Sequence, residues 1–378
     1  MSPLPTNVAA TTVARAEASE EPFDGRLVPL DALRGIAIAL VILHHVGLRF
    51  PDMARGWFGN FLVAIGWAGV DMFFAISGYL ITTILLRSFE SGALRAFYLK
   101  RFFRIVPLYL LALLVFAAAS FLTGNDREVL GRLWMNALFL TAWVIPFFGE
   151  NGVPYTITWS VSVEEFAYLL FGAITLLGAH RFRLSLYWIT VAAFAIRVIS
   201  IGWFAFEPIT LYYFAPGRID AIATGGLAAI AAPSSVRRLS VSPWIPWLVW
   251  VATVGVLSIL HREDPLVATL GYTLIAFASA WLVLSIANLP KRKSGVVTAW
   301  IAKLGLVSYF VYLFHGFVIG AVFRFLPALW SSYLNVWVLA IATLLLIYPP
   351  AWLSWKFLEY PLIKTGRRIA SRETVSAP

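Results

Sequence analysis

The chain has 378 residues, of which 60% are hydrophobic and only 13% charged, and it contains no cysteine. This composition excludes a water-soluble globular enzyme and indicates a polytopic membrane protein, while the lack of cysteine excludes disulfides, thiolate-ligated metals and a cysteine nucleophile. The formal charge of +10 comes from short basic clusters between apolar runs, as in proteins oriented in a membrane by their loops, so nucleic-acid binding is not predicted.

The ends of the chain differ from its middle. Residues 1–26 are polar and lack the apolar segment of a signal peptide, which predicts a disordered cytoplasmic tail. Residues 27–363 are expected to form one transmembrane domain, followed by a second cytoplasmic tail at 364–378. No separate soluble domain is predicted, because no polar stretch is long enough to bury a core of its own.

Apolar runs long enough for spanning helices predict an all-α polytopic transmembrane helix bundle of about ten spans. They lie near 30–49, 60–86, 104–122, 164–179, 185–206, 211–231, 243–260, 267–288, 301–323 and 334–357.

A further apolar run at 132–148 is predicted not to cross the membrane. If it does not cross, and both termini are cytoplasmic, the basic clusters all fall on the cytoplasmic side, as the positive-inside rule requires. These clusters lie at 87–104, 181–183, 237–238, 291–293 and 364–368. We therefore expect a multi-pass protein of the cell inner membrane with an irregular outer segment at 123–162, where Pro146, Gly149 and Pro154 disfavour a regular helix.

The first apolar run contains Asp31, Arg34, His44 and His45. Arg34 and His45 are eleven residues apart, so they share one helical face within about 20° and lie roughly 16 Å apart, whereas His44 points elsewhere. A guanidinium can hold phosphate and an imidazole can move protons. The alternative is that Arg34 is a helix-end charge and that the histidines make a packing hydrogen bond.

The second run, GVDMFFAISGYLIT, places Asp71 and Ser77 inside an apolar helix. A buried carboxylate needs a partner, and we expect Arg34 or a histidine of the first helix to supply it. Asp71 is accordingly assigned to the catalytic group. Ser77 is assigned to the cavity wall, with a small-residue helix contact as its alternative role.

The third run begins with KRFFRIVPLY, which presents Arg101 and Arg104 at the cytoplasmic boundary. These guanidiniums are suited to bidentate recognition of a phosphate-bearing cytosolic ligand. Anchoring to the membrane surface is the alternative.

The segment TWSVSVEE carries Trp159, Ser160, Glu164 and Glu165 at the outer start of a helix. An N-terminal capping pattern would explain one glutamate but not two beside a tryptophan. Glu164 is therefore a candidate catalytic residue.

Two further polar features interrupt later spans. Arg218 and Asp220 are expected to form a local charge pair that lines a cavity, and His315 lies in the middle of a helix with Ser308 and Tyr312 on related faces. A structural histidine is the alternative role for His315. No Walker loop, HExxH or GxSxG motif is present, and no metal site is predicted.

Together these segments resemble the acyltransferase-3 family of integral membrane O-acyltransferases, over about Leu30 to Leu362. The first helix is similar to the family's arginine, ten residues, then histidine signature, KRFFRIVPLY to its RxxR block and TWSVSVEE to its WSxxxE block. GVDMFFAISGYLIT, GRIDA and FLEYPL resemble further family blocks. The chain departs from the pattern at Phe166 and Ala167, where a Gln-Phe pair is usual, which affects the wall of the site but not Glu164.

The resemblance implies an acyl-CoA donor, with acetyl-CoA the expected form, bound from the cytoplasm by Arg34, Arg101 and Arg104. It also implies a carbohydrate or lipid-linked glycan acceptor, such as an exopolysaccharide or lipopolysaccharide precursor. We expect His45 to act as general base or transient acyl carrier, with Glu164 either orienting its imidazole or favouring its charged form. The cavity wall is expected to include Trp159, Ser160, Ser77, Arg218, Asp220 and His315.

Other functions are compatible with the sequence. The acceptor could instead be a small secondary metabolite such as a macrolide, and a proton-coupled transporter or a non-catalytic scaffold would also carry polar groups in its helices. The residues of this chain are not expected to include the soluble hydrolase-like domain that some family members carry. We therefore expect transfer by the membrane helices alone or with a separate periplasmic partner.

Overall fold

The computed structural model describes residues 28–49, 61, 63–91, 94–124, 130–235, 244–260, 263–289, 295–325 and 336–376. The predicted tail at 1–26 and the basic clusters at 237–238 and 291–293 lie outside these residues. Across the described ranges the regular structure is helical and contains no strand, which confirms the all-α bundle. In the same ranges, eight helices are long and apolar enough to cross a membrane, and two apolar helices at 244–259 and 296–306 are shorter.

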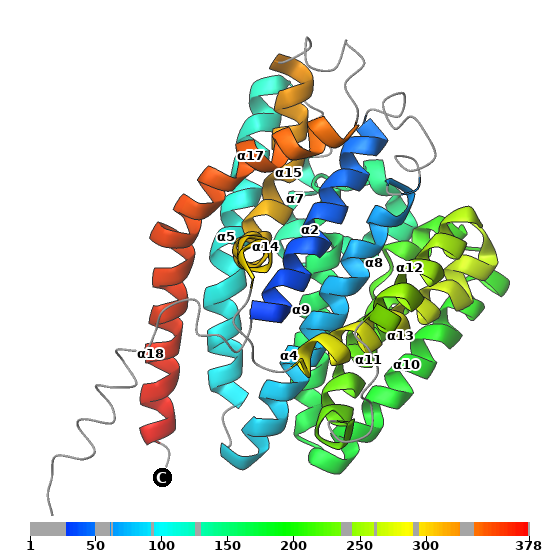
Figure 1. Ribbon diagram of the computed structural model, residues 1–378, viewed down its shortest axis with the longest axis vertical. Coiled ribbons are helices and arrows are strands. Elements are labelled where there is room, and N and C mark those ends of the chain that lie inside the picture. Colours follow the sequence, from blue (N-terminus) through cyan, green and yellow to red (C-terminus); the bar gives the residue numbers. More distant parts are fainter. Residues whose placement is uncertain are drawn as a thin grey trace, which may run out of the picture.

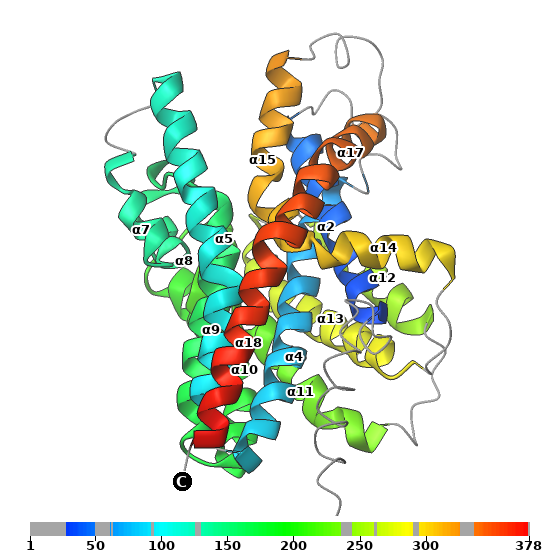
Figure 2. The same ribbon diagram turned by 90° about the vertical axis from the view of Figure 1, so that its left-hand side faces the viewer.

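The longer helices, shown in Figures 1 and 2, are α2 (Val28–Arg49), α4 (Gly69–Ser91), α5 (Leu94–Thr123), α9 (Trp159–Thr175), α10 (Ala179–Gly202), α11 (Ala215–Ser235), α12 (Trp244–Ile259), α13 (Tyr272–Ala287), α14 (Val296–Leu306), α15 (Ser308–Phe325), α17 (Val336–Ser354) and α18 (Tyr360–Ser376). Short π-helical segments precede α13 at Val267–Gly271 and α18 at Trp355–Glu359.

Helices α4 and α11 pack against each other at the centre of the bundle through glycines. A Cβ added to Gly78 of α4 would lie 1.8 Å from the carbonyl oxygen of Ile222, and one added to Gly225 of α11 would lie 2.2 Å from that of Ala75. Small residues allow membrane helices to approach this closely, because lipid gives them little hydrophobic reason to associate.

The described residues between α5 and α9 form no spanning helix, as predicted for the irregular segment at 123–162. Its helices, α7 (Leu133–Ala137) and α8 (Thr141–Phe148), have five and eight residues and are too short to span a bilayer. Asn136 holds the segment together, since its side-chain amide nitrogen lies 3.2 Å from the hydroxyl of Thr141, 2.9 Å from that of Thr158 and 3.0 Å from the carbonyl oxygen of Tyr155. Helix α9 starts at Trp159, five residues earlier than the predicted span, and the chain leaves the helical conformation at Gly178, where φ is +90°.

The predicted single span at 301–323 is wrong, because the chain breaks at Val307 into α14 and α15. Helix α14 is seen end-on in Figure 1 and lies across the bundle in Figure 2. The crossing is tight: a Cβ on Gly305 would lie 1.7 Å from the carbonyl oxygen of Asp31, and one on Gly35 would lie 2.1 Å from that of Ile301. This close packing of α14 on α2 accounts for the break, which periodicity does not reveal.

The C-terminal segment also differs from its prediction. A disordered tail was expected from residue 364, but α18 continues to Ser376 and runs beside α5 (Figure 1). Ile363 and Ala370 are buried, and Gly366 lies so close to α5 that an added Cβ would be 2.8 Å from the Cβ of Phe103. Packing therefore orders a segment whose polar composition alone predicted disorder.

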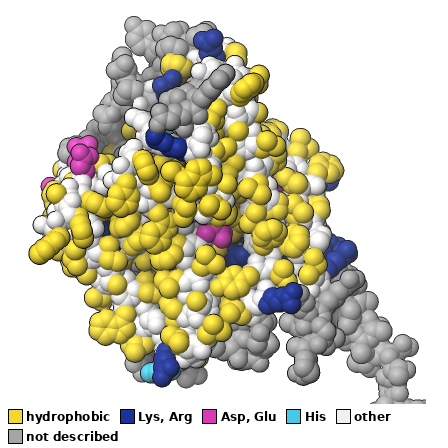
Figure 3. Space-filling view, turned by 180° about the vertical axis from the view of Figure 1, so that it is seen from behind, with side chains coloured by type: hydrophobic (Ala, Val, Ile, Leu, Met, Phe, Trp, Pro, Cys, Tyr) yellow, Lys and Arg dark blue, Asp and Glu magenta, His cyan; other side chains and the backbone are white. Residues whose placement is uncertain are grey.

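The outer surface is suited to lipid. Hydrophobic side chains cover most of the face in Figure 3, and Lys and Arg lie mainly toward its edges. In Figure 1 the end of α4, the start of α5, the α9–α10 turn and the end of α18 share the lower end of the molecule. The described basic clusters therefore lie at one end, as the predicted topology requires.

Candidate active site

A polar cavity lies where α2, α4, α5, α9 and α15 meet. We call it the arginine cavity; its polar wall consists of Arg34, Ser77, Arg101, Arg104, Ser160, Glu164, Tyr168, Ser308, Tyr309 and Tyr312. It has an empty volume of about 690 Å³, its open mouth included, and Phe73, Phe74 and Ile105 are among its apolar lining residues. Its lining residues come from five helices and run from Arg34 to Tyr312 in the chain.

The three arginines predicted to bind a donor all line this cavity. Arg34 is paired with Asp31 one turn earlier at 2.8 Å, and each side chain keeps 17% of its surface exposed. Arg101 lies over the ring of Tyr168, with 5.0 Å from its Cζ to the ring centroid. Guanidiniums held in this way keep N–H groups that can bind phosphate.

Glu164 is the carboxylate of the arginine cavity. Its Oε1 accepts a hydrogen bond from the hydroxyl of Ser77 at 2.7 Å, and its Oε2 accepts one from Tyr168 at 3.1 Å. The carboxylate is also within electrostatic reach of Arg101 and Arg34. Both of its oxygens are thus held by hydroxyl groups on α4 and α9, and the expected orienting of the His45 imidazole by Glu164 stays a prediction.

Ser160 and Trp159 have different positions although they are adjacent. Ser160 lines the cavity and donates to the hydroxyl of Tyr312 at 2.7 Å, which in turn donates to the carbonyl of Ile157. Trp159 instead packs among aromatic rings, with its centroid 4.8 Å from that of Tyr212. It is a buried support behind the cavity wall.

His45 and His315 face each other across the α2–α15 contact. Their ring centroids are 4.7 Å apart. Arg34 and His45 therefore both face α15, which confirms the predicted shared face of the first helix, whereas the Nδ1 atom of His44 meets the carbonyl of Val63. Tyr312 connects the histidine pair to the cavity, because it lines the cavity and its carbonyl oxygen lies 2.6 Å from Nδ1 of His315.

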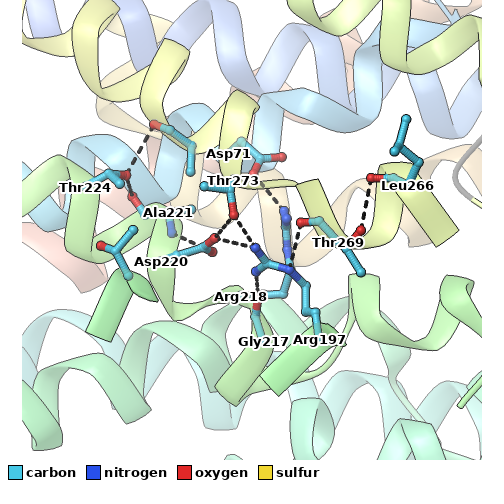
Figure 4. A network of polar contacts seen from close by, with 12 residues as sticks. Asp71, Arg197, Gly217, Arg218, Asp220, Ala221, Thr224, Leu266, Thr269 and Thr273 are labelled. Carbon is cyan, nitrogen blue, oxygen red and sulfur yellow. Dashed lines mark hydrogen bonds and ion pairs between the residues drawn. The ribbon is translucent and has the colours of Figure 1, made fainter. Parts of the chain in front are cut away.

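Asp71, Arg218 and Asp220 belong to a separate buried ion-pair network, shown in Figure 4. Arg218 donates to Asp71 at 2.7 Å, and Arg197 donates to Asp220 at 2.8 Å, with all four side chains fully buried. Two predictions are thus wrong: Asp71 pairs with neither Arg34 nor a histidine, and Arg218 and Asp220 do not pair with each other. Residues two apart on a helix point in different directions, so each finds its partner on another helix.

Arg197 is the network member that sequence analysis missed. It lies on α10 and also donates to the carbonyl of Gly217 and to the hydroxyl of Thr273, so it joins α10, α11 and α13. The signal was available, since an arginine in the middle of an apolar span is costly unless paired.

Comparisons with known proteins agree with this architecture. A family model described as an acyltransferase domain, Acyl_transf_3, matches residues 28–355. The peptidoglycan O-acetyltransferase OatA of Listeria monocytogenes is 26% identical over 91% of this chain and 57% of its own length. The O-acetyltransferase OatA of Staphylococcus aureus is 24% identical over 92% of this chain and 59% of its own length. The chain thus spans less than two thirds of these curated relatives. No solved structure gives a significant match.

Proposed function

Because the chain belongs to the acyltransferase family whose model covers residues 28–355, we propose that it moves an acetyl group from acetyl-CoA to a hydroxyl group of an envelope glycan. The observation that carries the proposal is the arginine cavity, in which three guanidiniums surround one hydrogen-bonded carboxylate inside the bundle. The relative named as a peptidoglycan O-acetyltransferase supports a glycan as acceptor.

The donor end of the reaction is assigned to Arg34, Arg101 and Arg104. The phosphates of coenzyme A are anionic, and guanidiniums bind phosphate through paired N–H groups. Ser308 at the start of α15 adds a helix N-terminus to the same wall, which also favours negative charge. Glu164 balances the positive charge of these arginines when no phosphate is bound.

The acceptor end is assigned to His45. Its imidazole takes the proton of the acceptor hydroxyl, whose oxygen then attacks the thioester carbonyl carbon; the C–S bond breaks and the thiolate of coenzyme A receives the proton. An unassisted sugar hydroxyl is a poor nucleophile at neutral pH, so this base supplies an essential part of the rate. The glycan stands on the outer side in this scheme and the donor on the cytoplasmic side.

The donor assignment is tested by calorimetry. The double variant Arg101→Ala and Arg104→Ala should weaken binding of coenzyme A to the purified chain, since two phosphate-binding groups are lost. Arg183→Ala is the matched control, because Arg183 is exposed near the start of α10 and is not part of the cavity wall. Equal affinities of the double variant and the wild type would remove the donor site from the arginine cavity.

The acceptor assignment is tested by transfer of radiolabelled acetyl groups into base-labile esters in membrane vesicles. His45→Ala should lower transfer by about 10²–10⁴-fold, the contribution of a general base, while the chain still folds and binds coenzyme A. His180→Ala, at the exposed start of α10, should transfer normally. Uptake of label without ester formation by the wild type would instead favour a transporter.

A further inference from the structure

The histidine pair contains a buried nitrogen without a partner. His315 is fully buried, and its Nε2 atom has no hydrogen-bond partner among the residues that the structure describes. A buried polar atom of this kind is costly unless some state of the protein uses it. The imidazole ring of His45 packs against the ring of His315, with 4.7 Å between the two ring centroids and an interplanar angle of 69°.

The hydrogen bonds of the two rings fix where their protons lie. Nδ1 of His315 is 2.6 Å from the carbonyl oxygen of Tyr312, and Nδ1 of His45 is 2.8 Å from that of Val41. A carbonyl oxygen only accepts, so each Nδ1 must carry the hydrogen and donate it. In the neutral state each Nε2 then bears a lone pair, and the pair holds two basic nitrogens at the same helix contact.

Resting on the proposed function, we infer that His315 is a positioning residue that holds the protonated form of His45 during acyl transfer. When His45 takes the hydroxyl proton, its ring becomes a cation with a new N–H group at Nε2. This N–H points to the reacting atoms, so the neutral ring of His315, packed against the same imidazole, stabilises the cation through the lone pair at its own Nε2 until the leaving thiolate removes the proton. His315 gains and loses no atoms in the cycle.

The surroundings of His315 hold its ring in place for this task. Tyr312 anchors Nδ1 through its carbonyl, and its own hydroxyl is fixed by Ser160 and by the carbonyl of Ile157. Tyr155 donates to the carbonyl of Leu313, which ties the same turn of α15 to the segment before α9. An imidazole held by one nitrogen on a fixed turn presents the other nitrogen in a constant direction.

Two amide substitutions separate this role from a structural one. His315→Asn places an amide near the position of Nδ1, so it keeps a donor for the carbonyl of Tyr312 but offers nothing at the position of Nε2. His315→Gln reaches the position of Nε2 and keeps an acceptor there, but loses the bond to Tyr312. A purely structural histidine predicts that Asn is the better replacement, whereas the positioning role predicts Gln.

The experiment uses the full chain in membrane vesicles with radiolabelled acetyl-CoA, and measures kcat and KM for base-labile ester formation on the vesicles' own glycans. We expect His315→Asn to lower kcat by about 10²-fold or more, at the lower end of what general base catalysis contributes, with KM for acetyl-CoA unchanged. His315→Gln should remain within about tenfold of the wild type.

Retention of activity by His315→Asn, or equal loss in the two variants, would overturn the role of His315. Failure of the proposed function is distinct from this, because the wild type itself would then form no labelled ester from acetyl-CoA.

Discussion

Several charged side chains of this protein lie inside the helix bundle, away from water. Each is stabilised there by a particular partner. Glu164 is held by two hydroxyl groups, and Asp71 is held by Arg218. The two carboxylates differ in whether a ligand can reach them. Glu164 and Arg101 line a cavity open to a ligand, whereas Asp71 and Arg218 are fully buried. We therefore assign the first group to chemistry and the second to holding helices together.

Removing one partner of the buried pair should destabilise the fold. Asp71→Asn leaves the cation of Arg218 buried without its counter-charge and should cost about 3–5 kcal/mol of unfolding free energy. The double variant Asp71→Leu and Arg218→Met removes both charges and should be more stable than the single variant. Unfolding in detergent micelles measures both. If the double variant lost as much unfolding free energy as Asp71→Leu and Arg218→Met lose together when made singly, the pairing would be contradicted.

At the scale of helices, glycines decide where two backbones can meet. Helix α14 crosses α2 through Gly35 and Gly305, and this crossing sets the start of α15 at Ser308, on the cavity wall. The crossing therefore affects the site. If α14 moves away from α2, the start of α15 moves with it, and the α15 side chains that line the cavity are displaced. A Cβ added to Gly316, on α15 itself, would meet no atom within 4 Å.

The two glycines make a matched pair for substitution. Gly305→Ala would place a Cβ 1.7 Å from the backbone of Asp31, so the helices must separate, and we expect a loss of about 1–3 kcal/mol of unfolding free energy together with weaker coenzyme A binding. Gly316→Ala meets no atom within 4 Å and should be neutral or slightly stabilising, since alanine favours a helix. Equal thermal stability of the two variants would contradict the tight crossing.

The described basic clusters mark one end of the whole molecule. The turn between α9 and α10 and the end of α18 lie at the lower end in Figure 1, with described basic residues such as Arg181 and Arg367, whereas the end of α5 at Thr123 lies at the upper end. Positive loops tend to remain in the cytoplasm, so we expect the lower end to face the cytoplasmic side. A soluble thioester would then reach the arginine cavity from that side.

The lack of native cysteine makes this orientation directly measurable. In cells, His180→Cys at the α9–α10 turn should be protected from an impermeant maleimide, and Thr123→Cys at the end of α5 should be labelled. Both positions are exposed, so burial does not explain a difference. Permeabilisation should make the two variants react equally. Labelling of both from outside would place the two ends on the same side and contradict the topology.

The amino-acid sequence is enough to identify the class of protein, most of the helices and the four charged residues of the arginine cavity. Long apolar runs must be helical in lipid, and a charged side chain within them must have a use, so Arg34, His45, Arg101, Arg104 and Glu164 stand out without a structure. The tertiary structure alone decided their partners. Periodicity gives the face of a helix but not the helix opposite, so it could not show that Glu164 meets Ser77, that Asp71 meets Arg218, or that His45 meets His315. It also could not show the break at Val307 or the order of α18, because both depend on close contacts between segments far apart in the chain.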